Sequence, residues 1–404
     1  MTKWQEVKLG DIISIKHGYA FKGEGISDVD NGIVLVTPGN FAIGGGFQEK
    51  KCKFFIGEYP AEYILNKNDL IVTMTDLSKE CDTLGYSALV PNNNKLYLHN
   101  QRIGLVEFKS NAIDKYYLYW YMRTKKYQHF IVSGCSGSVI KHTSPNRICA
   151  TIIHLPPLDI QKKIAGVLGA LDDKIELNNK INQNLEAQAQ ALFKSLYNME
   201  NNGTLNDIID TVETGNRPKG GARSYGIPSI GAENIEKFGV YDYSKEKFID
   251  KDFYESMKRG KVKSGDVLLY KDGAYTGKVS LALDGFPHKT CAVNEHVFII
   301  RGNPQISSQF FIYFCLSNEV NKNYLHTLAS SKAAQPGLNQ AELLSLPIFI
   351  PPIDLLKNFT NNVSSIMHKI AANALENVKL SILRDTLLPK LMNGEIDVDN
   401  VKID

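Results

Sequence analysis

The chain repeats one stretch of sequence, HLPPLDIQKKIAGVL from His154 to Leu168 and FIPPIDLLKNFTNNV from Phe349 to Val363. The two stretches begin 195 residues apart in a chain of 404, and each places two prolines, an aliphatic residue and an aspartate before a long helical pattern. Proline suits the run-up to a helix, and aspartate suits its positive N-terminal end. We therefore expect a long helix after each proline pair.

The key residues after each proline pair alternate at spacings of four and three, and most of them are apolar. The first series is Ile164, Leu168, Leu171, Ile175, Asn178, Asn182, Leu185, Ala189, Leu192 and Leu196, and the second is Phe359, Val363, Ile366, Ile370, Asn373, Asn377, Leu380, Leu387 and Leu391. A sustained alternation of this kind is typical of a coiled-coil seam. It predicts a first helix from Asp159 to Tyr197 and a second that Pro389 ends or kinks in its last turn.

Each series contains two asparagines at matching places, Asn178 and Asn182 in the first and Asn373 and Asn377 in the second. A buried asparagine layer costs stability but fixes the register and orientation of a coiled coil. If the two helices pair antiparallel, these layers meet near the middle. The alternative is that the asparagines lie on the solvated faces of the helices. We predict that they set the register.

The repeat extends through most of the chain. Five more pairs of segments occur in the same order: Leu9–Gly18 with Leu205–Gly215, Asn66–Met74 with Val262–Tyr270, His99–Phe108 with Val293–Arg301, Tyr116–Met122 with Phe310–Leu316, and Cys135–Ser144 with Ser330–Asn339. A period this long is no solenoid repeat, so it indicates a duplicated unit. Within each copy, short β-branched and aromatic runs alternate with turn residues, and the aromatic segments at 116–122 and 310–316 read as helices.

These patterns predict four segments and an α+β fold. Residues 1–154 and 201–349 are expected to form two copies of one α/β domain, and residues 155–200 and 350–404 are expected to form the two long helices with coiled-coil seams.

Composition excludes several classes of protein. Lys and Arg number 46 and Asp and Glu 43, so the net charge of +3 does not by itself indicate a nucleic-acid binder. The six cysteines form no C-x-x-C pair and are typical of a reducing cytoplasm. No apolar run is long enough to span a bilayer, and the nine histidines lack metal-ligand spacing. We expect a cytoplasmic protein with no membrane partner and no metal site.

Catalytic motifs are also missing. GAYTGKV at 273–279 is one residue short of a P-loop between its glycines, and GCSGS at 134–138 lacks the last glycine of a nucleophile elbow. The proline pairs, LPPL and IPPI, differ from the Asn/Asp-Pro-Pro-aromatic signature of an adenine methyltransferase. The sequence therefore predicts a protein that is not itself an enzyme.

Local charge suggests contact with DNA. Residues 115–147 hold six Lys or Arg and no acid, and basic residues attract phosphates while polar loop residues can read base edges. Each of these positions has an alternative role as an ordinary surface or core residue. The predicted DNA contacts are Lys22, Arg102, Lys141, His142, Arg217, Lys219, Arg223, Lys271, Tyr275, Lys278, Lys332 and Gln335.

The order of domain, proline-led helix, domain and proline-led helix resembles the specificity subunit of type I restriction-modification systems. The resemblance covers nearly all of the chain and is carried best by LPPLDIQKKIAGVLGALDDKIELNN and IPPIDLLKNFTNNVSSIMHKIAAN. In this family a Glu-Gln or similar pair commonly opens the helix; Ile160–Gln161 fits this pattern and Leu355–Leu356 departs from it.

The resemblance implies two target-recognition domains, related by a pseudo-twofold axis, that each read half of a bipartite sequence in double-stranded DNA. It further implies that the two long helices form an antiparallel coiled coil, which acts as a ruler for the gap. It also implies partners, namely two modification subunits that bind S-adenosylmethionine and methylate adenine N6, and two restriction subunits that use ATP and Mg. This chain would need no cofactor of its own. The alternative is a scaffold or regulatory adaptor that links enzyme subunits without reading DNA.

Overall fold

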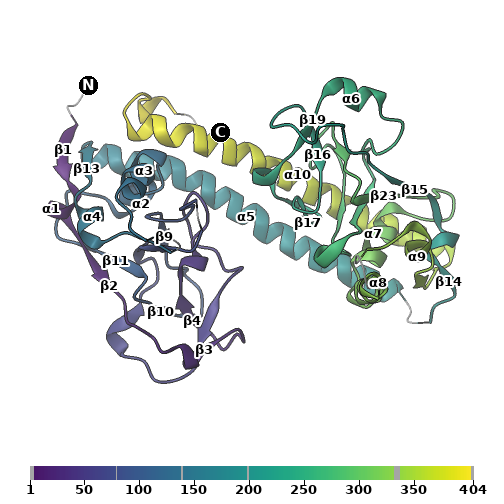
Figure 1. Cartoon of the computed structure of the whole chain (residues 1–404), viewed down its shortest axis with the longest axis horizontal. Coiled ribbons are helices and arrows are strands. Elements are labelled where there is room, and N and C mark those ends of the chain that lie inside the picture. The colour runs from purple at the N-terminus through teal and green to yellow at the C-terminus, as the bar shows by residue number, and fades with distance from the viewer. Residues whose placement is uncertain (1–3, 79, 138–139, 198–199, 332–336, 402–404) are drawn as a thin grey trace. The chain divides into compact units, whose positions relative to one another are not determined.

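The computed structural model describes residues 4–78, 80–137, 140–197, 200–331 and 337–401. The chain divides into two compact units: unit 1 comprises residues 1–172 and 382–404, and unit 2 comprises residues 173–381. Two long helices, α5 (Leu158–Leu196) and α10 (Ile353–Met392), each contribute one part to unit 1 and the other part to unit 2 (Figure 1).

Unit 1 contains two main sheets. The first is antiparallel, in the order β2 (Ile13–His17), β11 (Ile103–Phe108), β7 (Leu70–Thr73), β9 (Ser87–Leu89). The second has the order β3 (Ile26–Ser27), β5 (Lys53–Phe55), β4 (Ile33–Val36), β10 (Leu96–His99), β6 (Ile64–Leu65), and β4 and β10 run parallel. Two small pairs join β1 (Gln5–Lys8) to β13 (Ile152–Leu155) and β8 (Thr75–Asp76) to β12 (Lys141–His142). The short helices are α1 (Leu9–Ile12), α2 (Lys115–Tyr121), α3 (Lys125–Ser133) and α4 (Pro145–Cys149), with 3₁₀ turns η1 (Gly23–Gly25), η2 (Pro38–Asn40), η3 (Ala61–Tyr63) and η7 (Val398–Asn400).

Unit 2 repeats this plan. Its four-stranded antiparallel sheet has the order β15 (Ile209–Thr214), β23 (Val297–Gly302), β20 (Val267–Tyr270), β21 (Val279–Leu281). A second sheet has the order β19 (Phe248–Ile249), β16 (Ile227–Ile230), β22 (Ala292–Val293), and β14 (Gly203–Thr204) pairs with β24 (Pro347–Ile348) and β17 (Ile235–Lys237) with β18 (Val240–Tyr241). The short helices are α6 (Lys251–Ser256), α7 (Gln309–Ser317), α8 (Glu319–Ser330) and α9 (Gln340–Leu344), with 3₁₀ turns η4 (Leu205–Asp207), η5 (Tyr243–Lys245) and η6 (Gly273–Tyr275).

The two units share a four-stranded antiparallel sheet and a parallel strand pair. The sheet order β2-β11-β7-β9 corresponds to β15-β23-β20-β21, and the parallel pair β4 and β10 corresponds to β16 and β22. The predicted aromatic helices are α2 and α7, in nearly the predicted positions. The predicted α+β fold and the predicted duplication are both confirmed.

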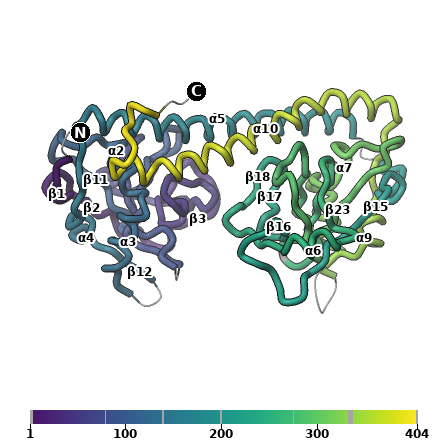
Figure 2. The backbone as a smooth tube through the Cα atoms, turned by 90° about the horizontal axis from the view of Figure 1, so that it is seen from above, coloured from purple at the N-terminus to yellow at the C-terminus, as the bar shows by residue number. Residues whose placement is uncertain are grey.

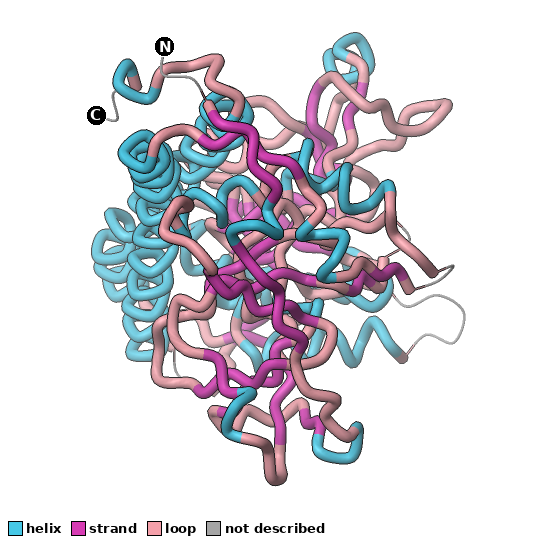
Figure 3. Tube along the Cα trace, turned by 90° about the vertical axis from the view of Figure 1, so that its left-hand side faces the viewer, coloured by secondary structure: helices cyan, strands magenta, loops and turns pink. Residues whose placement is uncertain are grey.

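The long helices pair antiparallel. Within unit 2, Asn178 of α5 contacts Asn377 of α10, and Asn182, one turn further along α5, contacts Asn373, one turn back along α10. Helix α5 has the predicted extent to within one residue at each end, and Pro389 lies in the last turn of α10, which ends at Met392. In unit 1 the strands lie to one side of the helix pair (Figure 3).

The aromatic helices pack each globular domain onto the long helices. In unit 1, Trp120 belongs to the core cluster that includes Leu168 of α5 and Leu391 of α10. In unit 2, Phe314 of α7 stacks on Phe193 of α5, with ring centroids 5.6 Å apart. Burial of large aromatic and aliphatic side chains is the main favourable term in such packing, since each fully buried side chain contributes about 1.5–3 kcal/mol.

Candidate nucleic-acid interface

One end of the four-stranded sheet in unit 1 gathers four loop segments, and we call it the loop end. Strand β2 continues there into Tyr19, whose backbone N–H donates to the His99 carbonyl at 2.8 Å. The turn that follows β10 presents the Arg102 carbonyl to the Met74 N–H at 3.0 Å. The Met74 carbonyl in turn accepts from the Thr143 N–H at 3.0 Å. A continuous row of backbone hydrogen bonds therefore joins segments that lie far apart in the sequence.

The loop end of unit 2 has two of these three backbone connections at equivalent positions, and a hydrogen bond from Gly215 replaces the third. The Gly215 N–H donates to the Asn294 carbonyl at 3.2 Å, and the Lys271 N–H donates to the His296 carbonyl at 3.0 Å. The Leu338 N–H donates to the Lys271 carbonyl at 2.8 Å. The loop ends of the two units therefore have closely similar backbones, each at the corresponding end of its own four-stranded sheet.

A glycine allows the close approach of chains in each loop end. A Cβ atom on Gly18 would lie 2.3 Å from the Asn100 carbonyl oxygen, and one on Gly215 would lie 1.6 Å from the Val293 carbonyl oxygen. Both distances are far below van der Waals contact, so only glycine fits without movement of the backbone. This explains why the matching sequence segments at 9–18 and 205–215 both end in glycine.

In unit 1 the structure brings three of the predicted DNA-contacting residues to the loop end. Arg102 is exposed on its turn, His142 is exposed with its Nδ1 3.1 Å from the Thr75 hydroxyl, and Lys141 donates to the Gly137 carbonyl at 2.9 Å. Figure 2 shows β12, which carries Lys141 and His142, on the side of unit 1 remote from α5. Lys22 is exposed immediately before η1, beside β3 of the five-stranded sheet.

The buried carboxylate of Asp76 fixes the backbone of the loop after β8, next to these residues. Asp76 pairs in register with Lys141 and is 3% exposed. Its oxygens accept from the backbone N–H of Ser78 at 2.6 Å and of Leu84 at 3.0 Å, and from both the N–H and the hydroxyl of Thr83. Burial alone would raise the pKa of Asp76, but these hydrogen bonds to the charged form lower it below the usual value. Asp76 therefore remains ionised and holds the loop after β8 in place.

In unit 2 the cations at the loop end are paired with acids. The Lys271 ammonium lies 3.0 Å from Asp272, whose other neighbour is the Nδ1 atom of His296 at 2.7 Å. Arg217 lies 3.8 Å from Glu295. Sequence reasoning missed Asp272, Glu295 and His296, although the alignment of HNQR at 99–102 with VNEH at 293–296 contained the signal for the last two.

The other predicted contacts in unit 2 are exposed or ion-paired. Lys219 is exposed in the glycine-rich loop, and Arg223 lies 3.1 Å from Asp250. Tyr275 is 59% exposed, and the Lys278 ammonium lies 4.7 Å from its ring centroid and 3.4 Å from Glu236. Surface pairs of this kind are weak, so these cations remain accessible to phosphate. Lys332 and Gln335 lie outside the described residues.

Two arginines of the basic run at 115–147 have structural contacts instead. Arg123 is 8% exposed and donates to Asp172, the Tyr119 hydroxyl and the Gly44 carbonyl. Arg147 stacks on Phe130, with its guanidinium carbon 3.6 Å from the ring centroid. The positive charge of this run is therefore only partly available to a nucleic acid.

The four asparagines predicted to set the register lie where the helices face each other. Asn178 and Asn373 are each 1% exposed. The Asn178 amide donates to Asn377 at 2.9 Å, and the Asn373 amide donates to Asn182 at 2.8 Å. Their side chains therefore satisfy one another inside the seam rather than facing solvent, and their role in setting the register stays a prediction.

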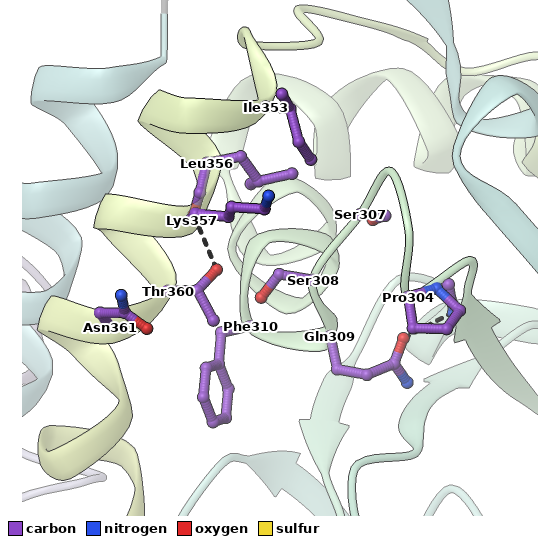
Figure 4. Close-up of a pocket in the computed structure, with 11 residues that line it drawn as sticks. Pro304, Ser307, Ser308, Gln309, Phe310, Ile353, Leu356, Lys357, Thr360 and Asn361 are labelled. Carbon is purple, nitrogen blue, oxygen red and sulfur yellow. Dashed lines mark hydrogen bonds between the residues drawn. The ribbon is translucent and has the colours of Figure 1, made fainter.

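A cavity of about 350 Å³ lies at the other end of the unit 2 sheet (Figure 4). It opens where β23 ends at Gly302, and its walls are the first turns of α10 and the loop before α7. Its lining includes Pro304, Gln309, Leu356 and Lys357. Because His296 precedes β23 and Gly302 ends it, this cavity belongs to the helix side of unit 2 and not to its loop end.

Comparisons with known proteins agree with this architecture. Residues 1–187 match the family model described as the type I restriction modification DNA specificity domain. The MjaIX specificity subunit of Methanocaldococcus jannaschii is 26% identical over 342 residues, which cover 79% of this chain and 76% of that protein. The HindI specificity subunit of Haemophilus influenzae is 24% identical and aligns with 98% of this chain and 100% of its own length. The chain is therefore similar, along most of its length, to type I restriction-modification specificity subunits.

A solved structure supports the fold of this specificity-subunit family for the chain. The S subunit of a type I restriction-modification system from M. genitalium superposes with a TM-score of 0.58 at 14% sequence identity, over 96% of each chain. In the part of the chain that the structure describes, no helix has the length and apolar character needed to cross a membrane. Within the same residues, no group of three or more His, Cys, Asp or Glu side chains is placed to hold a metal ion.

Proposed function

We propose that this chain is the DNA sequence-specificity subunit of a type I restriction-modification enzyme, in which each unit reads one half of an asymmetric bipartite target. The observation that carries this proposal is the pair of loop ends, built on one backbone plan but carrying different side chains. Two DNA-binding domains with the same backbone and different side chains in their loops are suited to two half-sites of different sequence. Because duplex DNA is itself pseudo-twofold, a duplicated protein matches its symmetry.

The proposal assigns the long helices two tasks. Their pairing sets the number of unspecified base pairs between the half-sites, and their free faces dock two methyltransferase subunits. Apolar side chains on these faces support the second task, because Leu158 and Ile382 in unit 1 are 37% and 62% exposed and Leu177 and Leu355 in unit 2 are 51% and 52% exposed. The cavity beside the start of α10 adds a concave element to the unit 2 share of this surface.

The chemistry belongs to the partners in this proposal. Two modification subunits would bind S-adenosylmethionine and methylate adenine N6, and two restriction subunits would use ATP and Mg. A methylated adenine must leave the base stack, so this chain would hold the duplex while a partner flips the base. The chain itself would be non-catalytic and need no cofactor.

The test is co-expression with the cognate modification subunits in a host that lacks adenine methylation, followed by single-molecule sequencing of methylated adenines. We expect one asymmetric motif of two short blocks with a constant gap. Exchange of residues 1–154 for those of another family member should then change one block and leave the other and the gap intact. A complex that assembles but methylates no motif would favour the non-reading scaffold and overturn the proposal.

A further inference from the structure

The turn between β10 and β11 in unit 1 has the same construction as the turn between β22 and β23 in unit 2. In unit 1 the Asn100 side-chain oxygen accepts from the Arg102 N–H at 3.0 Å, and the Ile103 N–H donates to the Asn100 carbonyl at 3.0 Å. In unit 2 the Asn294 side-chain oxygen accepts from the His296 N–H at 2.9 Å. An asparagine that bonds the backbone two residues ahead is a standard device for holding a tight turn.

Each turn is also held from two sides. On one side, each turn is bonded to the segment that contains the glycine. The Gln101 N–H donates to the carbonyl of Tyr19, the residue after Gly18, at 2.9 Å, and the N–H of Gly215 itself donates to the Asn294 carbonyl at 3.2 Å. On the other side, the residue after the central strand donates to the Arg102 carbonyl in unit 1 and to the His296 carbonyl in unit 2. Side chains on such a rigid turn are presented at a constant position with little loss of backbone entropy on binding.

The two side chains at the tip of the turn are the part that differs between the copies. Gln101 and Arg102 are exposed, and together they carry one positive charge. Glu295 and His296 occupy the same two places, with side chains 34% and 43% exposed. A constant backbone with different tips is the arrangement expected of two readers with different targets.

We propose that these tip pairs, Gln101–Arg102 in unit 1 and Glu295–His296 in unit 2, determine which base pairs each unit accepts. The proposal rests on the proposed function and names the residues that discriminate. Arginine donates two hydrogen bonds to the O6 and N7 atoms of guanine, and glutamine pairs in two-pronged fashion with adenine. Glutamate accepts from the amino group of cytosine, which neither Gln101 nor Arg102 favours.

The negative charge of Glu295 would repel the phosphates of DNA unless nearby cations offset it, and two such neighbours are present. Arg217 lies 3.8 Å from the Glu295 carboxylate, and His296 lies 3.4 Å from it on its Nε2 side. Asp272 holds the opposite ring nitrogen of His296 at 2.7 Å, which orients the ring. These neighbours place Glu295 and His296 as a polar pair and leave Lys219 and the partly paired cations for phosphates.

The experiment exchanges the tips within the full chain and reads the methylated motif of the assembled complex. Q101E/R102H should change the preferred base at one or more positions of one block by about tenfold or more and leave the other block intact. E295Q/H296R should do the same to the other block. The control K50Q/K51Q, which alters an exposed turn before β5 by the same net charge as Q101E/R102H, should leave both blocks unchanged.

A tip-exchanged complex that methylates both wild-type blocks with unchanged preference overturns the inference. Where a double variant fails to assemble, R102K and E295Q replace it, and binding of the complex to a randomised duplex library gives the preference directly. A shift confined to one block supports the inference, and an unshifted library overturns it. Failure of the proposed function is a separate result, because it appears as the absence of any motif with the wild-type chain.

Discussion

Unit 1 and unit 2 attach their globular domains to the long helices with different chemistry at equivalent positions. In unit 1 the attachment is ionic. Arg123, after the aromatic helix α2, donates to Asp172 of α5 at 2.9 Å, and Arg384 of α10 donates to the same carboxylate at 2.5 Å. Arg123 also lies over the Trp120 ring at 4.3 Å. One carboxylate therefore joins three elements of unit 1.

In unit 2 the equivalent positions are Ser317, Met367 and Ala189, as the 195-residue repeat and the alignment of the aromatic helices show. Met367 is 1% and Ala189 0% exposed, and both belong to the apolar core of that unit. The Ser317 hydroxyl donates within its own helix to the Phe314 carbonyl. A charged triad in unit 1 and two buried apolar side chains in unit 2 thus occupy equivalent positions of the repeat.

The first turn of each long helix shows the same difference, with a polar buried side chain in unit 1 and an apolar one in unit 2. Gln161 of unit 1 is 1% exposed and hydrogen-bonds the Ala112 and Pro156 carbonyls and the Asp114 N–H. Its counterpart Leu356 is 2% exposed and packs in the apolar core of unit 2. The duplicated backbone therefore tolerates either a polar or an apolar side chain at these positions, provided that every buried polar group keeps its hydrogen-bonding or ionic partner.

The largest effect we predict comes from removing one member of the triad. Asp172→Ala should lower the free energy of unfolding of unit 1 by about 3 kcal/mol, because it leaves the Arg123 guanidinium buried without its counter-charge. The triple variant R123S/D172M/R384A, which copies unit 2, should stay within about 1 kcal/mol of the wild type. Hydrogen exchange of the α2 amides measures both values.

The matched control for this pair of variants is Asp173→Ala, an exposed neighbour on α5 that should change stability little. A triple variant as unstable as Asp172→Ala would show that the two units are not interchangeable at this site. The loss of stability would then come from the surrounding packing and not from the unpaired charge.

The second prediction concerns pH, because unit 1 has the buried His99 where unit 2 has Val293. Burial lowers the pKa of His99 to about 4, and the hydrogen bond between its Nε2 atom and the Ile103 carbonyl opposes this only in part. The unfolded chain takes up this proton near pH 6.5, whereas folded unit 1 does so only near pH 4. Stability from this group is therefore full above pH 6.5 and is lost as the pH falls towards 4.

Between pH 7 and pH 5 this group should cost unit 1 about 2 kcal/mol of stability, at about 1.4 kcal/mol for each unit of pH below 6.5. His99→Gln, which retains a donor but does not titrate, should remove that part of the pH dependence. Hydrogen exchange of β10 and β11 at the two pH values, compared between wild type and variant, provides the measurement. An identical pH dependence in both proteins would contradict the assignment.

The smallest effect should come from the feature that the two copies share. Asn178→Ala and Asn373→Ala should each lower the stability of the helix pair by about 1 kcal/mol, with loss of one or two buried hydrogen bonds. Asn178→Ala should cost more, because the Asn178 amide also donates to the Glu376 carboxylate at 2.8 Å. Hydrogen exchange of residues 173–196 reports both, and Asn362→Ala on the exposed face of α10 is the control. A greater loss for Asn373→Ala would reverse the expected asymmetry.

Most of the fold could be predicted from the periodicity and the internal repeat of the sequence. The helices and the duplication were predictable, because a seam at spacings of four and three and an internal repeat are properties of the linear chain. The antiparallel pairing of the helices was implied by the family resemblance. The meeting of the asparagine layers followed from their matching places in an antiparallel pair, whereas the contact between Asn178 and Asn377 came from the structure. The position of Arg102 on an exposed turn could be predicted from turn residues alone.

The chemistry of individual side chains needed the tertiary structure. The sequence marks Arg123 and Lys141 equally as members of one basic run, yet Arg123 is buried against Asp172, 49 residues away, and Lys141 lies at the loop end. Likewise, Glu295 and His296 became candidates only when the sheet brought them beside Asp272 and Arg217. Local sequence determines periodicity and turn formation because these depend on near neighbours. Burial and ion pairing depend on which distant segments meet, and only the folded chain decides that.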